Sequence, residues 1–138
     1  MSKRLRAQVR SRAGHRCEYC LLAETLHPGR FTVEHIIAEK HGGLTELPNL
    51  AWACLHCNLH KGTDLVGREG TGPRAKLVPL FNPRRHKWSR HFRFQGLYIV
   101  GRTAIGRVTV SVLAMNERSR VELRQNLIAE GRFLPGYF

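Results

Sequence analysis

The sequence predicts an α+β fold in which a metal ion ties two distant segments together. The four cysteines form two Cys-x-x-Cys pairs with the same internal spacing. Between the pairs, residues 30–37 are rich in β-branched side chains, which is typical of a strand. Near the end of the chain, residues 117–130 have helical apolar spacing and are followed by Gly131, a common residue beyond a helix C-terminus.

The two cysteine pairs predict a structural zinc site, formed by Cys17, Cys20, Cys54 and Cys57. Four thiolates with this spacing give the tetrahedral sulfur site that structural zinc prefers. Two disulfides are the alternative, but the basic segment 1–16 lacks the apolar run of a secretory signal. We therefore expect Zn²⁺ as a cofactor and a cytoplasmic location, with disulfides and a redox-active pair ranked lower. No stretch approaches the about 18 apolar residues of a membrane span, so we expect no membrane partner.

For the first half of the chain the sequence predicts, in this order, a helix, two strands and a helical turn. Residues 2–13 are good helix formers with few apolar positions, which predicts an exposed, cationic helix with Ser2 as N-cap and Gly14 after its end. The apolar segment 50–54 is the expected partner of the strand at 30–37. A helical turn is expected at 58–61.

The second half is less regular in its pattern. We expect a turn at 28–29, a polar connection at 67–73, an extended segment at 77–81 and a hairpin over 92–100. Residues 104–115 fit both strand alternation and a helical face, and we favour the helix.

The charge of the chain favours a polyanionic partner. Lysine and arginine total 23 against 10 acidic residues, a formal net charge of +13. Proteins this basic commonly bind phosphate backbones, although a solvated basic surface without a dedicated partner is the alternative. Basic residues interleaved with aromatic ones in the middle of the chain, including Arg84, Arg85 and Lys87, are candidate nucleic-acid contacts.

A group of polar residues lies between and just after the cysteine pairs. Glu34 and His35 end the predicted strand, Asn49 precedes the second strand, and Asn58 directly follows the last cysteine. Lys61 lies three residues after Asn58, on the same face of a helix. Each residue alone is more often structural than catalytic, but their order between the zinc-type pairs is specific.

The pattern comprises Val33-Glu34-His35-Ile36-Ile37, Gly42-Gly43, Asn49-Leu50 and Cys54-x-x-Cys57-Asn58-x-x-Lys61. Over about residues 15–62 it resembles the HNH endonucleases of the ββα-metal class in their zinc-knuckle form. This resemblance implies a two-stranded antiparallel ribbon packed on a helix. We expect a single domain over residues 1–138, with an HNH core at about 15–62 and a hairpin-plus-helix extension at about 77–138.

The resemblance also implies roles for the site residues. His35 would be the general base that deprotonates water, and Asn49 would tie down the loop and orient that histidine. Glu34 and Asn58 would bind a catalytic Mg²⁺ or Mn²⁺ ion. Lys61 joins the candidate nucleic-acid contacts.

Three positions depart from the family pattern. Glu34 stands where aspartate is frequent, and Ala38 stands where proline is common after the histidine. The third motif position is Asn58 rather than histidine, which favours metals that prefer oxygen ligands.

Three functions fit these observations to different extents. A metal-dependent endonuclease acting on DNA accounts for all the motif residues, with RNA as the alternative substrate. A zinc-stabilised nucleic-acid-binding module without catalysis, or a structural zinc domain that binds protein, would account only for the cysteines and the charge. The sequence leaves the substrate's structure and the oligomeric state open.

Overall fold

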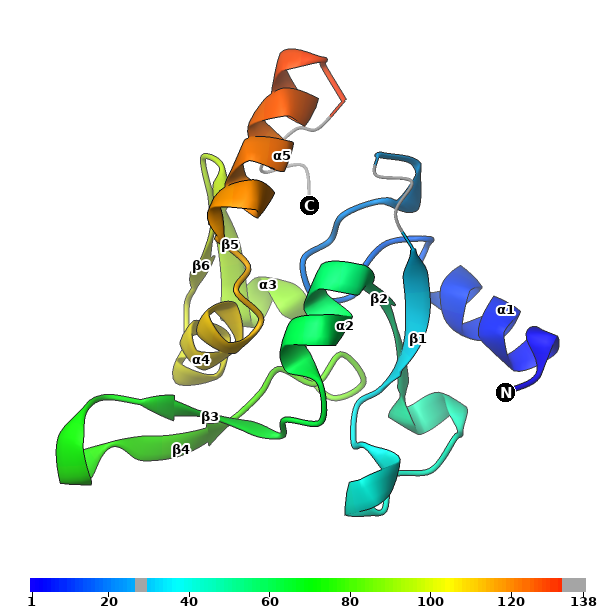
Figure 1. Cartoon of the computed structure of the whole chain (residues 1–138), viewed down its shortest axis with the longest axis horizontal. Helices are drawn as coiled ribbons and strands as arrows, with labels where there is room; N and C mark the ends of the chain where they lie inside the picture. Colours follow the sequence, from blue (N-terminus) through cyan, green and yellow to red (C-terminus); the bar gives the residue numbers. More distant parts are fainter. Residues whose placement is uncertain (27–29, 133–138) are drawn as a thin grey trace. The chain divides into compact units, whose positions relative to one another are not determined.

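Figure 1 shows a computed structural model of the chain, which describes residues 1–26 and 30–132. These residues form two compact units. Unit 1 comprises Met1–Leu65 with Asn82–His86, and unit 2 comprises Val66–Phe81 with the described residues from Lys87 onward. The sequence predicted a single domain with an extension at about 77–138; within that segment, Asn82–His86 lies in unit 1 and the other described residues lie in unit 2.

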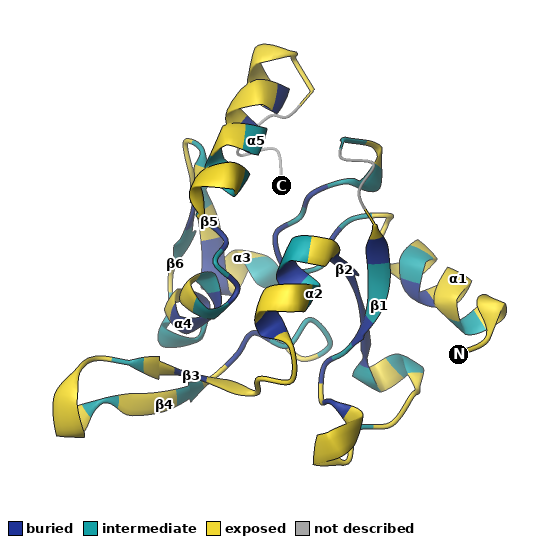
Figure 2. Ribbon diagram, viewed as in Figure 1, coloured by how far each residue is buried: buried dark blue, intermediate teal, exposed yellow. Residues whose placement is uncertain are grey.

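An antiparallel ribbon of two strands forms the centre of unit 1, as expected. β1 (Phe31–His35) pairs with β2 (Leu50–Cys54), so that His35 lies opposite Leu50 at the end of the ribbon. Every residue of β2 is buried, whereas β1 has a mixture of buried and half-buried positions (Figure 2). α2 (Leu55–Lys61) follows β2 without a loop, so the helix is longer than the turn predicted at 58–61.

The N-terminal helix α1 (Lys3–Arg12) is capped as predicted. The Ser2 hydroxyl accepts a hydrogen bond from the Leu5 amide at 3.1 Å, and Gly14 has a positive φ of 64° after the helix. Val9 is the one buried residue of α1, so apolar burial alone fixes the helix weakly.

Arginines of α1 attach it to the ribbon. The Arg6 guanidinium lies 4.8 Å from the centre of the Trp52 ring, a cation–π arrangement. The Arg12 guanidinium donates to the Leu50 carbonyl at 2.6 Å, and Arg10 makes a bidentate pair with Glu24. Part of the positive charge at the start of the chain therefore serves the fold of unit 1.

Unit 2 contains two hairpins and three helices among its described residues. α4 packs against β3, β4 and β6. The elements are β3 (Val66–Glu69), β4 (Lys76–Pro79), α3 (Trp88–His91), β5 (Phe92–Gln95), β6 (Tyr98–Gly101), α4 (Ala104–Val112) and α5 (Arg118–Ala129). β3 pairs with β4 and β5 with β6, both antiparallel.

Most elements predicted for the second half are confirmed, and one prediction is wrong. The segment 104–115 is helical over α4, where the Thr103 hydroxyl caps the helix by accepting from the Gly106 amide at 3.1 Å. The polar connection predicted at 67–73 is instead largely a hairpin, because Gly67 permits close packing: a Cβ there would lie 2.8 Å from Cβ of Val108. The turn predicted at 28–29 lies outside the described residues.

In the described part of the chain, four short 3₁₀ helices lie in the connections. They are η1 (Glu24–Leu26), η2 (Glu39–His41), η3 (Leu47–Asn49) and η4 (Gly72–Arg74). η2 and η3 lie in the loop that joins β1 to β2, and this loop carries part of the candidate site. Within the described ranges, no helix combines the length and apolar character that crossing a membrane requires.

Candidate active site and metal centre

The four cysteines converge in unit 1 as the sequence predicted. All four are buried and free of disulfides, and their sulfur atoms lie within 4.8 Å of one another. In each pair the amide of the second cysteine donates to the sulfur of the first at 3.5 Å, from Cys20 to Cys17 and from Cys57 to Cys54. These matching contacts place the sulfurs around one point.

The sulfur arrangement fits a zinc ion. Zn–S bonds of about 2.3 Å in a tetrahedron place the sulfurs about 3.8 Å apart, and the Cys20 and Cys54 sulfurs are 3.8 Å apart. Burial raises the pKa of Cys17 well above its ordinary value, and neighbouring thiols add to this effect. Zinc stabilises the thiolate form, so its binding would release protons from these thiols.

A pocket of about 210 Å³ lies beside the end of β1 in unit 1. Its lining includes Glu34, His35, Glu39, Asn58 and Thr63. Glu34 and His35 reach the same pocket because β1 ends at His35. Asn58 reaches it from α2, whose start is held by the cysteines. The zinc-type centre therefore fixes the helix that carries one side of the pocket.

Glu34 forms a buried ion pair with Lys61. The Lys61 ammonium donates to Oε1 of Glu34 at 2.5 Å, and each side chain is 2 % exposed. The same ammonium donates to the Ile36 carbonyl at 2.9 Å, and the Tyr19 hydroxyl donates to Oε2 of Glu34 at 2.6 Å. Both oxygens of the carboxylate thus have a protein donor.

Two opposing effects act on the protonation of Glu34. Burial raises its pKa and is the larger effect, while the charge and hydrogen bond of Lys61 and the hydrogen bond of Tyr19 lower it. The pKa remains above its ordinary value. A carboxylate has about four lone-pair positions, so Glu34 retains acceptor capacity beyond these two donors.

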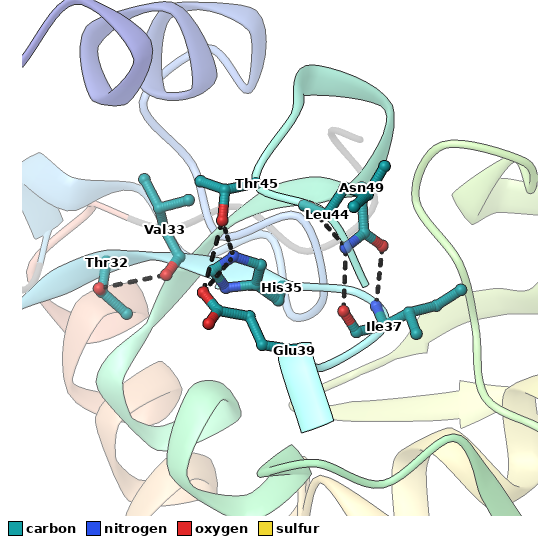
Figure 3. Close-up of polar contacts among 8 residues, drawn as sticks. All are labelled: Thr32, Val33, His35, Ile37, Glu39, Leu44, Thr45 and Asn49. Carbon is teal, nitrogen blue, oxygen red and sulfur yellow. Dashed lines mark hydrogen bonds and ion pairs between the residues drawn. The ribbon is translucent and has the colours of Figure 1, made fainter. Parts of the chain in front are cut away.

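The His35 ring lies at the edge of the pocket and contacts the loop that follows β1 (Figure 3). Its Nε2 atom is 2.9 Å from the Thr45 hydroxyl and 3.4 Å from Oε1 of Glu39. The Thr45 hydroxyl is in turn 3.4 Å from the same carboxylate oxygen. His35 is 22 % exposed at its side chain, so water can reach it.

Asn49 ties the loop to the end of the ribbon. Its Oδ1 accepts from the Ile37 amide, and its Nδ2 donates to the carbonyls of Ile37 and Leu44, all at 2.9 Å (Figure 3). Gly43 permits this arrangement, since a Cβ there would lie 1.7 Å from the Ile37 carbonyl oxygen. Asn49 makes no hydrogen bond to His35 among the described residues, so any effect on the histidine must pass through the loop.

Two candidate nucleic-acid contacts occupy positions that require correction. Lys61 is buried and therefore does not face a nucleic acid. Its ammonium needs acceptors inside the protein, and it finds them in Glu34 and the Ile36 carbonyl. Arg84 is 16 % exposed at its side chain and forms an ion pair with Glu18. Arg85 and Lys87 are exposed, which is compatible with the expected role.

The site also contains residues that the sequence did not indicate. Tyr19 lies between the two cysteines of the first pair, while Glu39 and Thr45 lie in a loop without periodic pattern. The one available signal was the four-residue separation of His35 and Glu39. This spacing indicates neighbouring side chains only within a helix, and His35 lies in a predicted strand.

The fold and the site define a class of protein: a ββα unit whose helix begins at a four-cysteine cluster suited to zinc and whose first strand ends in a histidine. A family model described as HNH endonuclease matches residues 17–64, so this part of the chain is similar to that family. No curated protein and no solved structure matches the chain. The family match indicates a nuclease or nucleic-acid-binding function in general.

Proposed function

We propose that the protein is a metal-dependent endonuclease that hydrolyses phosphodiester bonds of DNA. The observation that carries the proposal is the meeting of His35, Glu34 and Asn58 at one pocket of about 210 Å³. A base and two oxygen ligands at one pocket are the groups that metal-assisted phosphodiester hydrolysis requires.

In this proposal His35 takes the proton of the attacking water. Its side chain is within reach of solvent and its Nε2 atom is held by the loop, so the ring has a defined orientation. A positioned general base contributes about 10²–10⁴-fold to a rate. Asn49 would maintain the loop that holds the ring.

Glu34 and Asn58 would hold the divalent ion. Both offer hard oxygen donors, which suit Mg²⁺ or Mn²⁺. Bound at this place, the ion would stabilise negative charge on the phosphate. Because Lys61 lies 2.5 Å from Glu34, its positive charge opposes a second cation, which favours a loosely held ion that arrives with the phosphate substrate.

Arg85 and Lys87 would contact the nucleic-acid backbone. Both are exposed, and the chain carries a formal net charge of +13. Contacts to phosphates do not distinguish sequences, so we expect binding that weakens with salt and shows little sequence preference. Free cysteines arranged for zinc suit a reducing compartment such as the cytoplasm.

A second candidate function follows from the pairing of Glu34. This second candidate is a zinc-stabilised nucleic-acid-binding module without catalytic activity. In such a module Glu34 would bind no metal ion and would only accept hydrogen bonds from Lys61 and Tyr19, as it does here. Both candidate functions predict that the protein binds nucleic acid, but only the endonuclease would cleave it.

Plasmid nicking separates the two candidates. Zinc-loaded protein is incubated with supercoiled plasmid and either Mg²⁺ or Mn²⁺, beside His35→Ala and the control His41→Ala, whose histidine is exposed and outside the pocket lining. We expect nicking by the wild type and the control, and a loss of about 100-fold or more in His35→Ala. Plasmid binding without nicking under either metal would favour the second candidate.

A further inference from the structure

We infer that Thr45 and Glu39 are positioning residues for His35: they hold the proton on Nε2 and leave the lone pair of Nδ1 for water. The inference rests on the proposed function for its catalytic consequence. Its structural content concerns one hydrogen-bonded chain, from Nε2 of His35 through the Thr45 hydroxyl to the Glu39 carboxylate (Figure 3).

The direction of the hydrogen bonds follows from the acceptor at the end of the chain. A carboxylate offers only acceptor oxygens, and that of Glu39 is 72 % exposed at its side chain. The Thr45 hydroxyl, 3.4 Å away, therefore directs its proton toward Oε1 of Glu39. Its oxygen is then left to accept, and the partner 2.9 Å away is Nε2 of His35.

The direct contact between His35 and Glu39 requires the same proton position. Nε2 lies 3.4 Å from Oε1 of Glu39, and a protonated nitrogen is attracted there while a lone pair is repelled. A neutral imidazole carries one proton, so placing it on Nε2 leaves Nδ1 as the acceptor. Among the described residues Nδ1 has no hydrogen-bond partner, which leaves it accessible to a water molecule.

The loop that carries Thr45 is itself held in place. Asn49 donates to the carbonyl of Leu44, the residue next to Thr45, at 2.9 Å. The same amide group bonds both backbone groups of Ile37, two residues after His35. Asn49 thus fixes the distance between the strand end and Thr45, and this is how it would orient a histidine that it does not contact.

The tautomer of His35 can be measured without activity. Long-range ¹H–¹⁵N correlation spectra of the ¹⁵N-labelled, zinc-loaded full chain, recorded at about pH 8 where imidazoles are neutral, distinguish a proton on Nε2 from one on Nδ1. The chain has eight histidines, so His35→Ala identifies the signal. We expect the wild type to show the proton on Nε2.

The variants remove the two acceptors while keeping approximate side-chain size. Thr45→Val combined with Glu39→Leu should give a mixture of both tautomers, whereas Thr45→Ser, which retains the hydroxyl, should match the wild type. Glu46→Leu and Thr71→Val are matched controls, because both side chains are exposed and lie outside this chain of contacts. All four varied positions are exposed, so the fold should tolerate the changes.

Kinetics test the consequence for the reaction. In plasmid nicking with saturating metal, the double variant should lower kcat about 10-fold with KM unchanged, a smaller loss than in His35→Ala because the base is still present. If the double variant lost activity only because the loop is destabilised, Thr45→Ser should lose as much. We expect Thr45→Ser to be fully active.

The outcomes are distinguishable. A proton on Nδ1 in the wild type, or an unchanged tautomer in the double variant, would overturn the inference whatever the activity. A tautomer that shifts as expected, in a protein that never nicks DNA, would refute the proposed function and leave the assignment of Thr45 and Glu39 standing.

Discussion

Replacing Lys61 by methionine tests whether this lysine belongs to the interior of the domain or to a nucleic-acid surface. Methionine keeps the length and the apolar stem of the side chain but removes the ammonium. Glu34 would then remain buried with the Tyr19 hydroxyl as its one donor from the present set. The variant therefore isolates the charge from the packing.

The expected magnitude follows from burial. Both side chains are 2 % exposed and their charged atoms lie 2.5 Å apart, so Lys61 and Glu34 form a buried, hydrogen-bonded ion pair. Removing one partner of such a pair costs about 3–5 kcal/mol, whereas an exposed pair contributes about 0–1 kcal/mol. We expect Lys61→Met to lower the free energy of unfolding by about 3–5 kcal/mol, a large share of a typical domain's stability.

A double-mutant cycle separates the pair from the rest of the site. Glu34→Gln removes the negative charge, and in the double variant with Lys61→Met no uncompensated charge is left. The double variant should be more stable than the sum of the single losses predicts, with a coupling energy of about 2 kcal/mol.

Urea denaturation of the zinc-loaded proteins, followed by circular dichroism, gives these free energies. Lys40→Met is the control, because Lys40 is exposed. The reasoning is refuted if Lys61→Met is as stable as the control, or if the two single losses simply add.

Three further predictions address the zinc centre, the loop and acid stability. Cys17→Ser should lose the about one zinc per chain measured by elemental analysis and should unfold unit 1; a folded, metal-free wild type would contradict the zinc assignment. Gly43→Ala should destabilise the loop by about 1–3 kcal/mol in urea denaturation, because its Cβ would lie 1.7 Å from the Ile37 carbonyl oxygen; wild-type stability would contradict that close approach. Burial raises the pKa of Glu24, but hydrogen bonds from Arg10 and Trp52 outweigh it and the net pKa is below its ordinary value. This depressed pKa contributes stability above about pH 4.5 that is lost as pH falls through the folded-state value; Glu24→Gln should reduce the pH dependence of the melting temperature in that range, and an unchanged profile would exclude the contribution.

Local patterns in the sequence predicted much of unit 1. The cysteine spacing predicted that the four thiols converge, and the β-branched segment and the apolar segment 50–54 predicted the paired strands. These predictions succeeded because the convergence of paired cysteines and the pairing of strands depend on residue types at short, regular spacings. Ser2 likewise caps α1, as predicted, by accepting from the amide of Leu5, three residues along the chain.

Predictions that relied on residue type alone were wrong where contacts between distant segments decide the structure. Gly67 looked like part of a loop, but α4 packs so closely on β3 that only a glycine leaves room. Lys61 and Arg84 looked like surface cations, but acidic partners 27 and 66 residues away along the chain draw them inward. Burial of a charge depends on such distant partners, and a local pattern carries no record of them.

The sequence by itself determined the family-like segment, the four converging cysteines and the candidate base, because each depends on residues at defined spacings. Only the tertiary structure decided what surrounds His35 and Glu34. Thr45 and Glu39 lie in an aperiodic loop, and Tyr19 lies 15 residues from the carboxylate it contacts. Hydrogen bonds between segments are set by how the chain folds back on itself, so they become visible only when the segments are placed in space.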